Sequence, residues 1–455
     1  MNDDTLAFPK GFLWGTATSA HQVEGNNDNN DWWDWEQIPG HIRDGHRSGR
    51  ACDHWNRFEE DFDLARSMGQ NAHRFSLEWS RIEPREGQWS RQAIEHYRRV
   101  LAALHARDME PLVTLHHFTN PRWLSNDGGW ENPRTIDLFE RYVRKVVEEL
   151  GDSVRLWITL NEPTVVPTLG YLLGRWPPGV KSLRRALRVM ANMIRAHGAA
   201  YRAIHQLRPE ARVSVAYNMI LFEPLRPSFP ADRWVAQVRD YFFNRLFLFA
   251  LIDGRLRFPL GRGQHLPEMR RSLDFIGLNY YYRHRMAFDP RRPGELFGRS
   301  VPPVAWEEDL PWWVGDIYPQ GLYRFLLELA GLGIPIYVTE NGLLERGDRL
   351  RPAYILTHLA AAYRALAAGV PVRGYFYWSL IDNFEWADGF TARFGLVHVD
   401  FSSQRRRLKK SGELYREIAR ANGISRQVVQ RCAPELAPEL FAKERQPKII
   451  ERVQV

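Results

Sequence analysis

Residues 156–163 read Leu-Trp-Ile-Thr-Leu-Asn-Glu-Pro, an apolar run rich in strand-forming residues that ends at a glutamate and breaks at a proline. Far along the chain, residues 336–342 read Ile-Tyr-Val-Thr-Glu-Asn-Gly and follow the same plan. Both segments are typical of β-strands that stop just after a carboxylate, here Glu162 and Glu340. The fold must explain why two distant strands end in the same way.

Outward from these segments, short apolar strands alternate with amphipathic helices. The predicted strands are Phe12–Ala17, Ala72–Ser76, Glu110–Leu115, Leu156–Asn161, Arg212–Tyr217, Phe275–Asn279, Ile336–Glu340 and Val372–Trp378. The predicted helices include Phe58–Met68, Ile94–Arg107, Ile136–Leu150, Leu183–Gln206, Gly321–Leu329 and Tyr354–Ala367. Repeated strand–helix units indicate a parallel sheet, and eight of them without a linker predict an α/β fold, a single closed (β/α)₈ TIM barrel.

Polar residues concentrate where the predicted strands end. They are Arg74, His117, Asn161, Glu162, Asn279, Glu340 and Trp378. In a barrel the carboxyl ends of the strands form the face that carries active sites, so we expect these side chains to meet there. A doubly wound sheet is the alternative, but it needs a glycine fingerprint after its first strand. The segment Gly11–Gly15 does not provide one.

The bulk composition is that of an ordinary globular protein. The 455 residues are 44% hydrophobic and 25% charged, with no apolar run of the ~18 residues that a membrane-spanning helix needs. The first residues lack a secretion-signal pattern, so we expect a cytoplasmic protein. Only Cys52 and Cys432 are present, which argues against a disulfide framework and favours passive thiols.

The net charge of +8 raises the question of nucleic-acid or membrane binding. The arginines, however, are scattered along the chain, and the densest basic cluster is residues 405–410. We therefore expect a solvated arginine-rich surface and neither a nucleic-acid nor a membrane partner.

Residues 1–425 are predicted to form the barrel. Residues 426–455 hold three prolines and little periodicity, and we expect an extension of unknown role that packs on the barrel or stays mobile.

Several motifs, in order, resemble glycoside hydrolase family 1, the β-glucosidase and β-galactosidase family. The likeness runs from FPKGFLWG at residues 8–15 to Ala-Asn-Gly at 421–423. Two glutamates facing one another are the minimum for cleaving a glycosidic bond with an acid and a nucleophile. The resemblance implies that Glu162 is the acid/base and Glu340 the nucleophile, with Arg74 and Tyr281 keeping Glu340 ionised. It also implies a retaining mechanism, with carboxyl groups about 5–5.5 Å apart.

The resemblance further implies a set of residues that bind the sugar at the non-reducing end, the glycone. They are Gln22, His117, Asn161, Asn279, Trp378, Glu385 and Trp386. Family members that act on 6-phosphorylated sugars lack a carboxylate at the position of Glu385, since it would repel the phosphate. Glu385 therefore predicts a neutral glycone. Glu24, in a neighbouring motif, is predicted to be structural.

Two features depart from the family pattern or stay open. His116 and Phe118 stand where the family usually has Tyr and Trp, and Phe118 lacks the indole donor. Adjacent His116 and His117 could suggest a metal, but no spaced third ligand accompanies them, so none is expected. On the aglycone side, Asn218, Trp306, Trp312 and Trp313 either line the entrance or pack at its rim.

The sequence thus predicts a retaining β-glycosidase that needs no cofactor or metal. The resemblance implies β-glucosides as substrates, with β-galactosides and β-fucosides also plausible. The alternatives are a transglycosylase that uses the same intermediate and a catalytically silent sugar-binding relative, although such relatives usually lose a glutamate. The expected partner is a small glycoside, and a homo-oligomer is compatible with the sequence.

Overall fold

The computed structural model describes residues 4–303 and 309–441 and has a closed barrel at its centre. Its parallel strands are β2 (Leu13–Ala17), β3 (Ala72–Ser76), β4 (Glu110–His116), β5 (Leu156–Asn161), β6 (Arg212–Asn218), β10 (Ile276–Asn279), β13 (Ile336–Asn341) and β14 (Val372–Trp378), paired in that order with β14 closing on β2. The predicted TIM barrel is confirmed, and every predicted barrel strand is present.

The strands are buried on both faces because side chains alternate between two cores. Along β5, Leu156 and Ile158 belong to the core inside the barrel, whereas Trp157 and Leu160 belong to the core between the barrel and its helices. Such strands read as continuous apolar runs, which explains why they were visible in the sequence.

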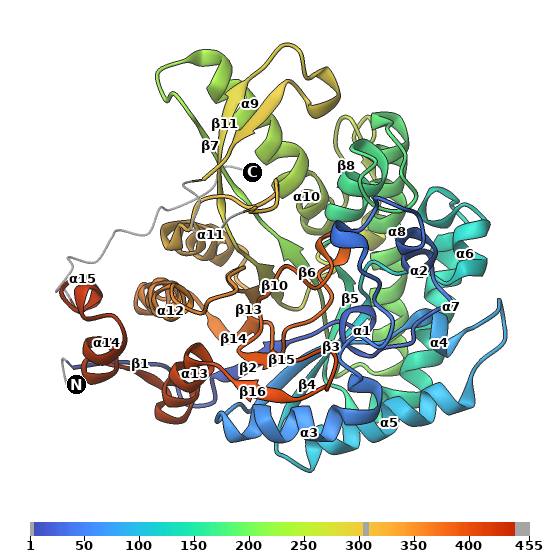
Figure 1. Cartoon of the computed structure of the whole chain (residues 1–455). Coiled ribbons are helices and arrows are strands. Elements are labelled where there is room, and N and C mark those ends of the chain that lie inside the picture. Colours follow the sequence, from blue (N-terminus) through green and yellow to red (C-terminus); the bar gives the residue numbers. More distant parts are fainter. Residues whose placement is uncertain (1–3, 304–308, 442–455) are drawn as a thin grey trace.

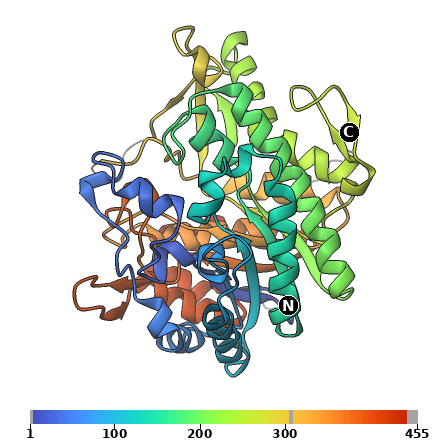
Figure 2. The ribbon, with the colours of Figure 1, turned by 90° about the vertical axis from the view of Figure 1, so that its right-hand side faces the viewer.

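Helices surround the barrel on all sides (Figures 1 and 2). They are α3 (His54–Ser67), α5 (Arg91–His105), α7 (Thr135–Leu150), α8 (Leu183–Leu207), α10 (Leu246–Asp253), α11 (Pro319–Ala330), α12 (Arg351–Ala367) and α13 (Lys410–Ala421). Ser90 and Ser182 cap α5 and α8 by accepting the backbone N–H of Ala93 and Arg185. None of these helices, or any other in the described ranges, is long and apolar enough to cross a membrane.

Shorter elements decorate the barrel. The helices are α1 (Ala20–Val23), α2 (Asp31–Glu36), α4 (Trp79–Ile82) and α6 (Arg122–Asn126), and the paired strands are β8 (Arg255–Leu256) with β9 (Gln264–His265) and β15 (Val397–Val399) with β16 (Arg406–Leu408). Several of them lie in the segments that follow barrel strands, so they help to build the face where the strands end.

A projecting lobe was not predicted. It consists of β7 (Leu221–Pro224), β11 (Arg283–Phe288) and β12 (Gly298–Val301), with α9 (Pro230–Asp240) packed on them, and it forms the top of the molecule in Figure 1. β7 follows barrel strand β6, and β11 follows β10, so the lobe rises from the carboxyl ends of these strands. Its strands are short, and β11 carries Arg283 and Arg285. The sequence therefore contains no apolar run from which these strands could be predicted.

The described part of the C-terminal extension packs on the barrel. Strand β17 (Gly423–Ser425) pairs with β1 (Thr5–Ala7), and α14 (Arg426–Cys432) and α15 (Ala437–Leu440) follow. Val429 and Leu440 are buried, and Ser425 caps α14. Residues 426–441 therefore pack on the barrel, which is one of the two options that the sequence left open. Residues 442–455 lie outside the described residues.

The basic cluster at residues 405–410 is only partly solvated, so the expected solvated surface is wrong at two positions. Arg406 is buried in an ion pair with Asp61 (Nε–Oδ1 2.9 Å), and Lys409 contacts Asp382 (Nζ–Oδ1 2.7 Å). Both aspartates are fully buried and need a charged partner, because an unpaired buried carboxylate is costly. Arg405, Arg407 and Lys410 are exposed, as expected.

Candidate active site

A cavity of about 1030 Å³ opens at the carboxyl ends of the barrel strands. Eight of the predicted site residues line it: His117, Asn161, Glu162, Tyr281, Glu340, Trp378, Glu385 and Trp386. The other three, Gln22, Arg74 and Asn279, are buried beside them and hydrogen bond to lining residues. The barrel therefore brings together all the residues that the motifs suggested.

Glu162 follows the last residue of β5 in a left-handed conformation with φ of 44°. Its backbone N–H donates to the Ala216 carbonyl on β6 (2.7 Å), which fixes this turn to the barrel. Its carboxyl Oε1 accepts a hydrogen bond from Asn279 Nδ2 at 2.9 Å. A non-glycine residue in this region is uncommon, and such conformations cluster at functional sites.

Glu340 lies within β13 and is buried. Arg74 Nη1 donates to its Oε1 at 2.5 Å, and the Tyr281 hydroxyl donates to its Oε2 at 2.5 Å. Each carboxylate oxygen therefore has its own donor, one of them a fixed cation. This environment favours the ionised form of Glu340.

Asparagine side chains join the two glutamates into one network. Asn161 Oδ1 accepts from Arg74 Nη2 (2.6 Å) and from Asn279 Nδ2 (3.2 Å). Thr339 holds Asn279 by donating to its Oδ1 at 2.7 Å. Glu162 and Glu340 are thus linked through Asn279, Asn161 and Arg74, although they are 178 positions apart in the sequence (340 − 162).

The two carboxyl groups share burial but differ in partners. Burial raises the pKa of Glu162, and the neighbouring Glu340 carboxylate raises it further; Asn279 and Arg74 oppose the shift. Burial also raises the pKa of Glu340, but Arg74 and Tyr281 act directly on it to lower it. These partners favour protonation of Glu162 over protonation of Glu340. This division is what an acid and a nucleophile require.

Polar and aromatic groups form the far wall of the cavity. Gln22 Nε2 donates to Glu385 Oε2 (3.1 Å) and to Asn383 Oδ1 (3.0 Å). The His117 ring lies nearly parallel to the Trp378 and Trp386 rings, with centroids 5.9 and 6.0 Å away. Asn383 was not singled out in the sequence, although it lies in the same motif as Glu385; what marks it is its contact with Gln22.

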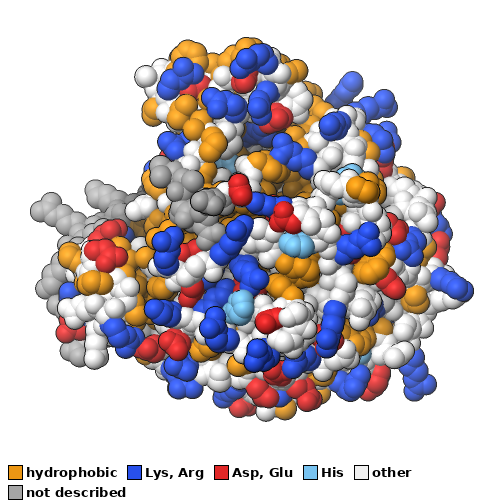
Figure 3. All heavy atoms as spheres, in the orientation of Figure 1, with side chains coloured by type: hydrophobic (Ala, Val, Ile, Leu, Met, Phe, Trp, Pro, Cys, Tyr) orange, Lys and Arg blue, Asp and Glu red, His pale blue; other side chains and the backbone are white. Residues whose placement is uncertain are grey.

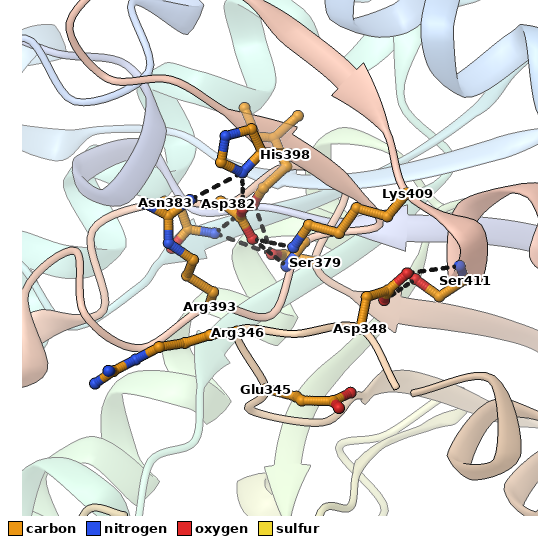
Figure 4. A network of polar contacts seen from close by, with 12 residues as sticks. Glu345, Arg346, Asp348, Ser379, Asp382, Asn383, Arg393, His398, Lys409 and Ser411 are labelled. Carbon is orange, nitrogen blue, oxygen red and sulfur yellow. Dashed lines mark hydrogen bonds and ion pairs between the residues drawn. The ribbon is translucent and has the colours of Figure 1, made fainter. Parts of the chain in front are cut away.

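The loop that carries Asn383 and Glu385 is anchored by Asp382 (Figure 4). Lys409, Arg393 and His398 surround this buried carboxylate at 2.7, 3.2 and 3.4 Å. Burial alone would raise the pKa of Asp382, but these partners, Lys409 first, lower it to about 2. The loop is therefore held by an ion cluster outside the cavity.

The departures from the family pattern have structural explanations. His116 is buried and pairs with Asn120 Oδ1 (3.1 Å) and Trp130 Nε1 (3.3 Å), outside the cavity lining. Phe118 does line the cavity and packs on Trp176 and Trp386.

Glu24 accepts a hydrogen bond from Tyr97 and forms an ion pair with Arg81, which is the structural role expected. In the described ranges, His, Cys, Asp and Glu side chains form no group that could hold a metal.

The outer part of the cavity is the entrance. Asn218, Trp312 and Trp313 all line it, so lining rather than rim packing is the outcome for these three. Trp306 lies outside the described residues. Four arginines that line the cavity were not predicted as site residues, because no motif contains them. They are Arg43, Arg175, Arg239 and Arg292.

Comparison with known proteins accounts for this arrangement. The sequence profile described as "Glycosyl hydrolase family 1" matches residues 4–424. The chain belongs to glycosyl hydrolase family 1. Beta-glucosidase A of Thermotoga maritima is 35% identical, over 92% of this chain and 98% of that protein. A beta-galactosidase of Pyrococcus woesei is 32% identical over 92% of this chain and 98% of its own length.

Solved structures agree with this family membership. A beta-glycosidase from Pyrococcus horikoshii has a TM-score of 0.86 and 39% identity, and the match covers 94% of this chain and 98% of that one. The beta-glucosidase from Thermotoga maritima in complex with glucoimidazole has a TM-score of 0.84 and 34% identity, covering 92% and 100%. The protein is therefore a family 1 glycoside hydrolase with a TIM-barrel fold.

Proposed function

We propose that the protein is a retaining β-glycosidase that removes terminal, non-reducing β-D-glucosyl residues, with β-galactosyl and β-fucosyl residues as further glycones. The observation that carries the proposal is the asymmetry of the two buried glutamates. Glu340 is bonded to a cation and a phenol, and Glu162 to a neutral amide. Relatives named β-glucosidase and β-galactosidase support the glucosyl and galactosyl residues as glycones.

In the first step a carboxylate oxygen of Glu340 forms a bond to the anomeric carbon. The bond from that carbon to the aglycone oxygen breaks, and its electron pair leaves with the oxygen. Glu162 gives its proton to this oxygen, so the aglycone departs as a neutral alcohol. Glu340 loses its negative charge as this ester bond forms, so the hydrogen bonds that it accepts from Tyr281 and Arg74 become weaker.

In the second step water attacks the anomeric carbon. Glu162, now ionised, accepts the proton of the water, and the bond to Glu340 breaks. Both carboxyl groups return to their starting states, and the sugar leaves with its original configuration. The geometry expected for this outcome is a carboxyl separation of about 5–5.5 Å, too short for a water between the groups.

Glycone recognition is proposed for the far wall of the cavity. Gln22, His117, Asn161 and Glu385 offer donors and acceptors for hydroxyl groups, while Trp378 and Trp386 offer aromatic faces for the C–H side of the sugar ring. Asn279 connects Asn161 to Glu162. The Glu385 carboxyl would repel a phosphorylated glycone, so neutral glycosides are the proposed substrates.

A panel of chromogenic β-glycosides that differ only in the sugar tests the proposal across pH. We expect hydrolysis of the glucoside, a bell-shaped profile, and β-glucose as the first anomer seen by proton NMR. Release of α-glucose first would contradict the retaining mechanism. Product analysis at high acceptor concentration separates hydrolysis from transglycosylation, which uses the same intermediate. No turnover of any member would favour the sugar-binding alternative.

A further inference from the structure

The entrance of the cavity has an uneven distribution of charge. Arg43, Arg175, Arg239 and Arg292 line it from four separate segments of the chain, and the described acids in the same lining, apart from those of the proposed glycone and catalytic sites, are Glu295, Asp309 and Asp388. Blue and red side chains both lie around the hollow beneath the projecting lobe in Figure 3. The question is which of these arginines lack a counterion.

Two of the acids are already engaged. Asp309 pairs with Arg43 (Oδ2–Nη2 3.4 Å), and Asp388 accepts a hydrogen bond from Trp313 Nε1 at 2.8 Å. Glu295 is then the remaining described carboxylate of the lining, and outside the lining Asp289 lies 3.7 Å from Arg292 (Oδ2–Nε).

Glu295 lies among those arginines but does not satisfy them. Its Oε1 is 3.2 Å from Arg292 Nη1, and its Oε2 is 3.9 Å from Arg239 Nη2. The Arg239 side chain is only 16% exposed and donates instead to the backbone carbonyls of Glu295 (2.6 Å) and Gly298 (3.2 Å). Its Nε has no partner in the described ranges, and burial lowers its pKa. A buried cation with so little compensation favours an added anion.

Arg175 completes this wall from the other side of the entrance. Its guanidinium lies 3.6 Å from the ring centroid of Trp312, which is 53% exposed. Within the described residues that guanidinium has no hydrogen bond or ion pair. Burial lowers the pKa of Arg175. The nearby Glu295 carboxylate opposes this shift, and the nearby Arg292 guanidinium adds to it. The planar donors of Arg175 are thus held by stacking and remain free for a ligand.

We propose that Arg175 and Arg239, with Arg292 adding positive charge beside them, form an aglycone subsite for substrates whose leaving group carries a carboxylate. This inference rests on the proposed glycosidase function and names its substrate class. A guanidinium binds a carboxylate through two parallel hydrogen bonds, which a neutral aglycone cannot provide. Trp312, Phe222 and Phe243 line the same cavity and suit an aromatic ring between the sugar and the carboxylate.

Matched substrates test the subsite. The 4-(carboxymethyl)phenyl and 4-(carbamoylmethyl)phenyl β-D-glucosides have the same shape, and a methylene separates the charge from the phenol oxygen. We expect kcat/KM to be about tenfold higher for the acid, as a charge-assisted hydrogen bond allows, and the ratio to fall as salt is added. Equal values, or a preference for the amide, would exclude aromatic acids as the ligands of the subsite.

A second pair identifies the source of the carboxylate. Cellobiose and the β-1,4-linked disaccharide of glucose with glucuronic acid differ by one carboxylate on the second sugar. If the preference for the acid is larger in the aryl pair, the subsite binds aromatic acids. If that preference is larger in the disaccharide pair, the subsite binds acidic sugars. Absence of an acid preference in both pairs contradicts the proposal.

Variants connect any preference to these arginines. Arg175→Gln, at an exposed position without a hydrogen bond to lose, is expected to bring the acid-to-amide ratio close to one, and Arg175→Glu to reverse it. Arg184→Gln on α8 removes the same charge from an exposed position outside this cavity and should keep the wild-type ratio. An unchanged ratio in Arg175→Gln would overturn its role. Turnover of 4-nitrophenyl β-glucoside by the wild type tests the glycosidase function separately, since that substrate carries no carboxylate.

Discussion

In the proposed mechanism Glu162 holds the proton beside the neutral Asn279 amide, whereas Glu340 holds the negative charge beside Arg74 and Tyr281. The two residues occupy similar positions at strand ends, so position alone does not decide their roles. Their immediate partners do. Replacing one partner at a time should therefore change one limb of the pH profile and leave the other in place.

Tyr281→Phe removes the hydroxyl that donates to Glu340. This hydrogen bond lowers the pKa of Glu340, so its loss raises that pKa and the nucleophile becomes ionised only at higher pH. We expect the acidic limb of kcat/KM to move up by about one pH unit. Tyr280→Phe is the matched control, because the Tyr280 hydroxyl donates to the Tyr318 carbonyl instead. An acidic limb that stays in place in Tyr281→Phe would contradict the assignment.

Glu162→Ala removes the proposed acid. Glycosides with poor leaving groups, such as cellobiose, should lose about 10²–10⁴-fold in turnover, since they need protonation. A dinitrophenyl glucoside needs little protonation and should lose much less in glycosylation. The alkaline limb, which reflects loss of the proton from Glu162 as pH rises through its raised pKa, should also disappear in this variant. Equal losses on both kinds of substrate would remove Glu162 from the acid role.

Residue types and their motifs could be predicted from the sequence, but their connections could not. Thr339 and Asn383 hold Asn279 and Gln22 through contacts between distant segments, and no local pattern encodes such contacts. The arginines of the entrance stand in no motif at all. Their shared location depends on how the projecting lobe folds over the barrel.

Among the elements, the barrel strands were the most predictable. The strands Ala72–Ser76, Leu156–Asn161 and Val372–Trp378 have the bounds expected, because burial on both faces demands a continuous apolar run. The lobe strands β7, β11 and β12 are short and include charged residues, so their pairing depends on tertiary contacts. Helix α9 was missed for a related reason, since it packs on this lobe rather than on the barrel.

The loop after β14 offers a test at this scale. Asp382→Asn breaks the cluster with Lys409 and Arg393 and leaves a buried cation unpaired. At neutral pH we expect a loss of about 3–5 kcal/mol in the free energy of unfolding. The native pKa of about 2 lies below the unfolded value of about 3.9, so this stabilisation is present above pH ~4 and lost as pH falls towards 2.

Urea titrations of the wild type and Asp382→Asn at several pH values measure this difference. Asp63→Asn is the control, because Asp63 is 68% exposed and pairs with Arg107 at the surface, where such pairs contribute about 1 kcal/mol or less. A difference between wild type and Asp382→Asn that does not shrink at low pH would contradict the ion-cluster explanation.

At the scale of the whole molecule, the single barrel was predicted because its strand–helix units succeed one another without a linker. The proposed boundary at residue 425 corresponds to a change in how the chain packs rather than to a change in sequence composition. The β1–β17 pairing closes the barrel domain, and Val429 and Leu440 then bury apolar side chains beyond it. Because neither Val429 nor Leu440 lines the cavity, we expect the extension to contribute to stability.

A chain that ends at Ser425 should therefore melt at a lower temperature but keep its kcat/KM. Losing the burial of Val429 and Leu440 corresponds to about 1.5–3 kcal/mol each, which lowers Tm by roughly 3–7 °C in a protein of this size. A chain that ends at Phe441 separates the contribution of residues 442–455 from that of 426–441. Loss of activity in a folded Ser425-terminated chain would show that the extension takes part in the site.

The central claim is that Glu340 forms a covalent bond with the sugar while Glu162 manages the proton. The most direct measurement is to incubate the enzyme with a 2-deoxy-2-fluoro-β-glucosyl fluoride, digest it, and locate the label by mass spectrometry, with Glu340→Gly as the unlabelled control. We predict a single fluoroglucosyl group on the peptide that contains Glu340 and loss of turnover in step with labelling. A label on any other residue, or inactivation without a label, would contradict the account.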